Sequence, residues 1–202
     1  MLNNLSTKKK LMLLPIIFIV IVIVCALVFS YFNQINNQRI KTATQTDIFI
    51  QQVLKGRISV YQFLRVPSEQ SAQKVKSDFK ELDNFVENLK PFLTEKENID
   101  LSNQILKLSA DYISNFDKFY QKRISDYNNG IQNESDEIST IIKQMVTVGL
   151  ELEEKLALMN KNTIELKSKS EKTMTLVLIL IAIISIIIFL TFSIILSNQL
   201  IN

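Results

Sequence analysis

The 202-residue chain contains no His, no Trp, three Gly and one Cys, and its formal net charge is +3. Without His it cannot form a Ser-His or Cys-His nucleophile, nor a mixed Cys/His zinc site. The three glycines lie far apart in the sequence, so they cannot form a loop that cradles phosphate groups. We therefore expect neither enzyme activity nor a cofactor or metal centre.

The excess positive charge is concentrated at the N-terminus. All Asp and Glu lie within 33–173, and so do all Lys and Arg except Lys8, Lys9 and Lys10. These three lysines form a basic tail, 1–10, directly before an apolar stretch. Such a cluster is typical of membrane orientation, and the neutral remainder offers no basic surface for phosphates. We therefore expect no nucleic-acid partner.

Two uncharged apolar stretches, 11–32 and 174–196, are predicted to be transmembrane helices. As helices they would span roughly 33 and 35 Å, enough for the hydrocarbon core of a bilayer. A cleaved signal peptide is the alternative for the first stretch, but its apolar region would be only about 7–15 residues long, ending at a small-residue cleavage site. We favour an uncleaved anchor. The positive-inside rule then places both chain ends in the cytoplasm and 33–173 outside.

Between these stretches, apolar residues recur with alternating steps of four and three, which is the heptad pattern of packed helices. The pattern predicts four amphipathic helices, at 33–65, 69–93, 100–127 and 135–173. The seam positions are Ile35, Arg39, Thr42, Thr46, Phe49, Val53, Gly56, Val60 and Phe63; Val75, Phe79, Leu82, Val86, Leu89 and Leu93; Leu101, Ile105, Leu108, Tyr112, Phe116 and Phe119; and Ile138, Ile142, Met145, Gly149, Leu152, Leu156, Met159, Thr163, Leu166, Ser170 and Thr173.

Local signals mark the boundaries of these helices. Pro67 disfavours helix at the residue before it and allows a new helix to open at Ser68. Pro91 ends the second helix, and Asp100 is the predicted cap of the third. Gly130 suits a left-handed cap at the end of the third helix.

The helix lengths predict an up-down-up-down four-helix bundle between the two membrane segments, because short connections join antiparallel neighbours. The two outer helices are longer than the inner two, so their membrane-proximal parts should form a two-helix stalk. Seam positions in this part turn polar, as at Arg39, Thr42, Thr46, Thr163 and Ser170. A polar seam packs poorly within one chain, so we expect a homodimer.

The layout of a basic tail, a membrane helix, a helical bundle and a second membrane helix resembles the sensory half of a bacterial methyl-accepting chemotaxis receptor. The stretches 55–64 and 108–116 resemble four-helix-bundle and helical-bimodular ligand-binding domains, and the tail 197–202 resembles the start of a HAMP linker. The resemblance implies a protein of the inner membrane whose sensor domain, 33–173, lies in the periplasm. It also implies cytoplasmic signalling partners that are reached only through a further C-terminal region.

Arginine is scarce in this chain, and two arginines with a tyrosine between them define a candidate ligand site. Arg57, Tyr61 and Arg65 follow one another at four-residue steps, so they share one stripe of the first bundle helix. A guanidinium binds carboxylates bidentately, and first-helix arginines contact anionic ligands in the resembling bundles. The simpler interpretation is a solvated face that pairs with acidic residues of a neighbouring helix. Tyr112, Phe116, Phe119 and Tyr120 are expected to pack in the core or at its rim.

These features predict a transmembrane sensor that detects a small organic anion or a periplasmic binding protein and signals through the second membrane helix. Two alternatives stay open: a scaffolding membrane protein, and the sensory half of a histidine kinase or cyclase.

Overall fold

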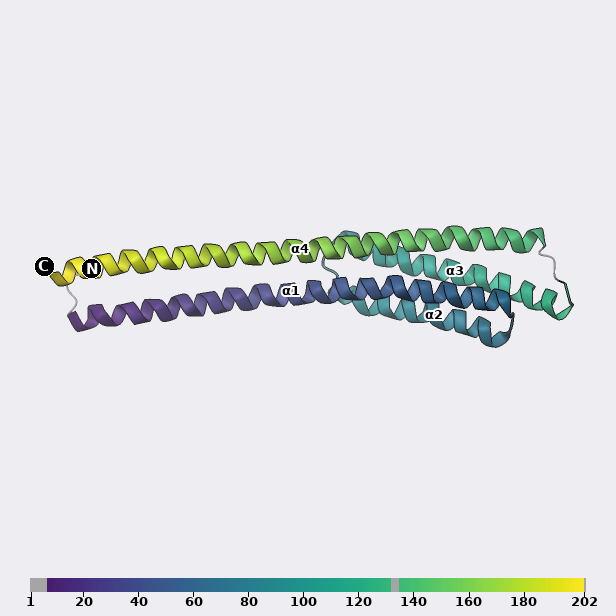
Figure 1. Ribbon diagram of the computed structural model, residues 1–202, viewed down its shortest axis with the longest axis horizontal. Coiled ribbons are helices and arrows are strands. Elements are labelled where there is room, and N and C mark those ends of the chain that lie inside the picture. Colours follow the sequence, from purple (N-terminus) through teal and green to yellow (C-terminus); the bar gives the residue numbers. More distant parts are fainter. Residues whose placement is uncertain (1–6, 132–134, 202) are drawn as a thin grey trace. The chain divides into compact units, whose positions relative to one another are not determined.

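The computed structural model describes residues 7–131 and 135–201 (Figure 1). Within these ranges the chain forms four α-helices and one short 3₁₀ turn, without any strand. The predicted all-α class is therefore confirmed. The predicted tails, 1–10 and 197–202, lie partly outside the described residues.

Helix α1, Thr7–Arg65, runs without a break from the first apolar stretch into the first amphipathic one. Beyond it, the backbone amide of Val66 donates to the Gln62 carbonyl at 3.0 Å. Pro67 then ends the helical backbone, as predicted, because a residue before proline is disfavoured in the helical region.

Helix α2, Glu69–Leu89, opens at the predicted position, with Ser68 as its cap. The hydroxyls of Ser68 and Ser71 each accept from the other residue's backbone amide, both at 3.1 Å, and this satisfies two N–H groups at the start of the helix. The predicted end at residue 93 is four residues too late. Lys90–Phe92 form a 3₁₀ turn instead, because Pro91 has no N–H with which to continue the α-helical pattern.

Helix α3, Lys96–Asn128, begins four residues before the predicted start, so the prediction of Asp100 as its cap is wrong. The capping position is Glu95, whose side chain makes no capping hydrogen bond. Asn98 explains the extension, because it is buried and its side-chain oxygen accepts from Asn162 of α4 at 3.3 Å. Burial of this turn therefore outweighs the local capping signal.

The end of α3 follows its prediction. Gly130 has a φ of 72°, the left-handed backbone that glycine adopts without strain. The amide of Ile131 returns to the Asp126 carbonyl at 2.9 Å, and that of Gly130 to the Tyr127 carbonyl at 3.1 Å. This pair of hydrogen bonds is the Schellman motif that closes many helices.

Helix α4, Asp136–Ile201, continues from the last amphipathic stretch through the second apolar one. The hydroxyl of Ser135 accepts from the backbone amide of Ile138 at 3.3 Å. Ser135 therefore caps the helix at its predicted start.

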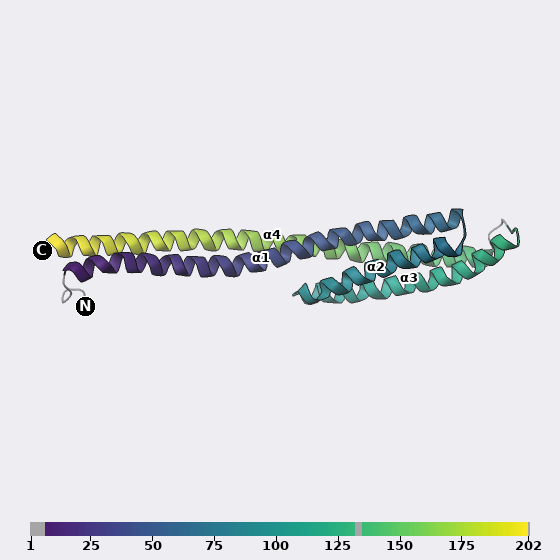
Figure 2. The same ribbon diagram turned by 90° about the horizontal axis from the view of Figure 1, so that it is seen from below.

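The chain divides into two compact units. One, which we call the core unit, is Arg39–Leu166. In this unit, α2 and α3 lie alongside the C-terminal part of α1 and the N-terminal part of α4 in both views (Figures 1 and 2). All seam positions predicted on α2 and α3 are buried, together with Phe49, Val53, Phe63, Ile138, Met145, Leu152, Leu156 and Met159 of α1 and α4. The four helices thus share one apolar core, which accounts for the stability of this unit.

The other unit, which we call the apolar unit, combines Met1–Gln38 with Lys167–Asn202. By length and composition, α1 and α4 are each apolar enough to cross a membrane. No described residue in their most apolar windows is buried, whereas the core helix of a soluble protein would be covered on most sides. This exposure is compatible with two membrane-spanning helices.

The polar seam positions of the core unit pair with one another. The hydroxyls of Thr46 and Thr163 lie 2.9 Å apart, and that of Thr46 also donates to the Asn160 side chain at 3.0 Å. Arg39 donates to the Leu166 carbonyl at 3.3 Å. At these three positions the polar groups of the seam find partners within one chain, contrary to the expectation that they pack poorly there. The homodimer itself stays a prediction.

Candidate functional site

The core unit contains a cavity of about 200 Å³ between α1, α3 and α4. Its walls are largely apolar, and a guanidinium and two tyrosine hydroxyls supply its polar groups. The lining residues are Arg57, Val60, Tyr61 and Leu64 of α1; Tyr112 and Phe119 of α3; and Ile142, Met145, Val146, Gly149 and Leu150 of α4. A concave apolar site with a few converging polar groups is the usual form of a small-molecule pocket.

The structure brings two of the three predicted site residues to this cavity. Arg57 and Tyr61 line it. Arg65 does not line it; this residue borders a separate, open hollow at the start of α2, with Ser68 and Lys74. The three-residue stripe therefore splits between two places on the surface.

The charge of Arg57 is already paired. Its guanidinium donates to the carboxylate of Glu153 on α4, and both side chains are about one-third exposed, at 39% and 33%. This hydrogen bond is the main cause of the raised pKa of Arg57, and burial opposes it. The simpler interpretation of the arginine stripe, pairing with an acidic residue of a neighbouring helix, is thus correct for Arg57. Glu153 was missed because 96 residues separate the two in sequence.

Tyr112 forms the inner wall of the cavity. Its ring stacks on Phe79 of α2, with centroids 4.5 Å apart and planes 13° from parallel. Burial raises the pKa of the Tyr112 hydroxyl to about 12, although the nearby charge of Arg57 lowers it. The hydroxyl is therefore neutral at physiological pH, and it can both donate and accept a hydrogen bond. Tyr112 and Phe119 are thus core residues that also line the cavity.

Two glycines make room for the stacked pair. A Cβ at Gly56 of α1 would lie 2.8 Å from Cε2 of Phe79, and a Cβ at Gly149 of α4 would lie 3.3 Å from Cε2 of Tyr112. One layer of the core unit therefore contains a glycine or a ring from each helix. Glycine costs about 1 kcal/mol in a helix interior, so its presence at two seam positions was a sequence signal for close approach. The heptad pattern by itself assigns both glycines only to the seam.

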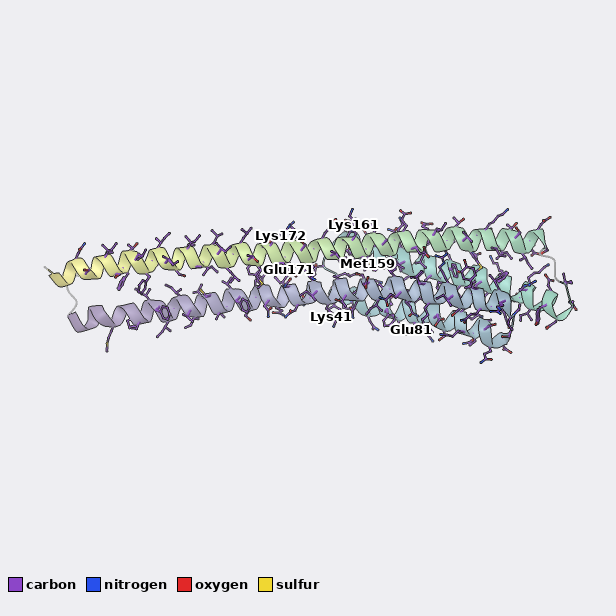
Figure 3. All side chains as sticks on the ribbon, viewed as in Figure 1. Lys41, Glu81, Met159, Lys161, Glu171 and Lys172 are labelled. Carbon is purple, nitrogen blue, oxygen red and sulfur yellow. The ribbon has the colours of Figure 1, made fainter. Side chains whose placement is uncertain are left out.

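A second polar cluster joins α1 to α2, and sequence reasoning missed it. The carboxylate of Asp78 is only 1% exposed. It accepts from Ser59 and from Lys74, both at 2.5 Å, and Lys55 lies 3.4 Å away. Burial raises the pKa of Asp78, but the hydrogen bonds from Lys74 and Ser59 and the lysine charges outweigh it and leave the pKa below its ordinary value. Lys55 also contacts Glu81 of α2, labelled in Figure 3, at 2.7 Å.

The Asp78 cluster compensates a buried carboxylate with two lysines and a hydroxyl, so we assign it a structural role. In the part of the chain that the structure describes, no group of three His, Cys, Asp or Glu side chains could hold a metal ion. The cavity at Arg57 is therefore the candidate site.

Comparisons with protein-family models, with curated proteins and with solved structures found no match. The function must therefore be argued from this chain's own residues.

Proposed function

We propose that the chain is the sensory part of a transmembrane receptor, in which a small molecule bound in the cavity alters the two helices that enter the membrane. One observation carries the proposal. The cavity is lined by α1 and α4, and each of these helices continues without a break into an apolar stretch long enough to cross a bilayer. A ligand in the cavity would therefore touch both membrane-entering helices directly.

The proposed architecture is an up-down-up-down four-helix bundle on the outer side of a bacterial inner membrane, flanked by two transmembrane helices. The exposed apolar side chains of both stretches support membrane insertion. The lysines at 8–10 support a cytoplasmic N-terminus. Two crossings then return the C-terminus to the cytoplasm, where a signalling region would follow, as in the chemotaxis receptors that the layout resembles.

The Arg57–Glu153 ion pair is the proposed point of control, because it joins α1 to α4 at the cavity. A ligand shifts a conformational equilibrium only through a difference in its affinity for the two states. A molecule that contacts both α1 and α4 would bind with different affinities to two states in which these helices are slid or rotated relative to each other. Arg57 and Tyr61 are the proposed ligand contacts, and Arg65 lies outside this site.

We also propose that the receptor is a homodimer. Leu54 and Ile58 of α1 stand one turn apart and are 48% and 57% exposed. Membrane insertion would hold two copies parallel, so the same face of each α1 could meet about a two-fold axis.

Cysteines at Leu54 and Ile58, introduced into a Cys25→Ser chain, should crosslink within membranes. Lys107→Cys, at an exposed position of α3, serves as the control. If Leu54→Cys crosslinks no better than Lys107→Cys, this face is not the interface.

The sensor proposal can be tested by fusing the chain to the HAMP and kinase-control region of a characterised chemoreceptor and measuring kinase output in cells. Glu153→Ala removes the proposed link between α1 and α4, whereas Glu154→Ala removes an exposed neighbouring charge. We expect Glu153→Ala to shift the basal output and Glu154→Ala to leave it unchanged. Unaltered output from Glu153→Ala, in a fusion that still responds to mutations in its HAMP region, would contradict the proposal.

A further inference from the structure

We propose that the cavity binds an uncharged, largely apolar molecule of about the size of a single substituted aromatic ring. The inference rests on the proposed function, since it names the class of ligand for the same site. The volume, the lining and the pairing of charges each favour this class over the small organic anion expected from the sequence.

The volume matches a ligand of one ring with a few further atoms. An engineered apolar cavity of about 150 Å³ stays free of water and binds benzene. The cavity here is larger, at about 200 Å³. It therefore has room for a benzene ring that carries a methyl and a hydroxyl group.

The lining is chemically suited to such a ring. Seven of the lining residues are aliphatic, thioether or phenyl side chains without a hydrogen-bonding group: Val60, Leu64, Phe119, Ile142, Met145, Val146 and Leu150. The transfer of apolar surface from water onto such walls is favourable in proportion to the area covered. The sulfur of Met145 adds a favourable contact with an aromatic ring. The hydroxyls of Tyr61 and Tyr112 can each satisfy one polar substituent on the ligand.

The charges in the site disfavour an ionised ligand. Arg57 already donates to Glu153 through one guanidinium nitrogen, so an anion would have to share the guanidinium with this carboxylate. The site would then hold two negative charges and one positive charge, an electrostatic cost that an uncharged molecule does not incur. A cation meets the same obstacle at Glu153. An uncharged ligand leaves the ion pair intact.

The test uses the full chain in nanodiscs, with p-cresol as the uncharged probe and benzoate as an anion of similar size. Dissociation constants are measured by titration calorimetry, and empty nanodiscs correct for partition into lipid. We expect p-cresol to bind at least about tenfold more tightly than benzoate, a difference of about 1.4 kcal/mol. Equal or tighter binding of benzoate, or no binding of p-cresol, would overturn the proposal.

Two pairs of variants locate the binding. Val146→Phe puts a ring into the cavity from a half-exposed position, and Ile164→Phe makes the same kind of change at a similarly exposed position of α4 outside the cavity lining. We expect Val146→Phe to weaken p-cresol binding at least about tenfold and Ile164→Phe to leave it unchanged. Circular dichroism melting confirms that each variant is folded. Equal affinities in the two variants would place the probe elsewhere and overturn the assignment.

Glu153→Gln separates the two ligand classes further. It frees the Arg57 guanidinium, so benzoate should gain affinity while p-cresol changes by less than about threefold. A loss of p-cresol binding that matches the gain of benzoate would contradict the neutral-ligand assignment. These measurements record binding without signalling, so their failure leaves the receptor fusion experiment as a separate test of the proposed function.

Discussion

Alanine at Gly56 and alanine at Gly149 should have different effects, although both glycines lie inside helices of the core unit. Each substitution gains about 1 kcal/mol of helix stability, because alanine is the best helix former and glycine among the poorest. At Gly56 the new methyl group would meet the Phe79 ring at 2.8 Å. Phe79 is 2% exposed and is stacked on Tyr112, so its ring cannot move into solvent.

The cost of forcing a methyl group into a packed core is about 1–3 kcal/mol. We therefore expect Gly56→Ala to lower the free energy of unfolding by up to about 2 kcal/mol after the helix gain is subtracted. At Gly149 the nearest atom is the edge of Tyr112 at 3.3 Å, so a shift of a few tenths of an ångström suffices. Gly149→Ala should be neutral or stabilising by up to about 1 kcal/mol.

Thermal unfolding of the full chain in detergent, followed by circular dichroism, measures both variants under the same conditions. The clash at Gly56 can be checked by a double-mutant cycle, since Phe79→Leu removes the ring edge that the new methyl group would meet. We expect Gly56→Ala to cost less in the Phe79→Leu background than in the wild type. If Gly56→Ala is as stable as Gly149→Ala in the wild-type background, the ring does not occupy the space beside α1 and the argument fails.

Two further predictions concern the Asp78 cluster and the end of α3. The lowered pKa of Asp78 stabilises the fold above the ordinary aspartate pKa of about 3.9, and this contribution is lost as the pH falls through the lower folded-state value. Asp78→Asn should therefore destabilise the chain at pH 7 by about 1–3 kcal/mol and flatten its pH dependence in acid denaturation; an unchanged acid profile would refute the role of this carboxylate. Gly130→Ala should cost about 1 kcal/mol because the φ of 72° is left-handed, while Gly130→Asn should cost less; equal melting temperatures for the two would contradict the strain argument.

Much of the fold could be predicted because its signals are local or periodic. The 4-3 spacing of Val75 and Phe79 and their successors identifies the buried face of α2 without any knowledge of its neighbours. Pro67 and Gly130 determine their boundaries through backbone restrictions that hold in any context. The prediction of Asp100 as a cap was wrong because capping preference contributes little free energy. Burial of Asn98, two residues earlier, favours a helix that starts before Asp100.

The candidate site was predictable only in part, since its chemistry depends on residues far apart in the chain. The stripe of Arg57 and Tyr61 follows from helical spacing. Their partner Glu153 lies on another helix, and no spacing rule connects the two. The pairing of Thr46 in the polar seam could not be predicted for the same reason, because its partner Thr163 lies on another helix.

The central claim, that the core unit stands outside the cytoplasm between two membrane crossings, is tested most directly by thiol accessibility in intact cells. In a Cys25→Ser chain, Asn129→Cys lies at an exposed turn between α3 and α4, and Ser197→Cys lies just beyond the second apolar stretch. A membrane-impermeant maleimide should label Asn129→Cys in intact cells and Ser197→Cys only after the membrane is permeabilised. Protection of Asn129→Cys in intact cells, or labelling of both positions there, would contradict the proposed topology.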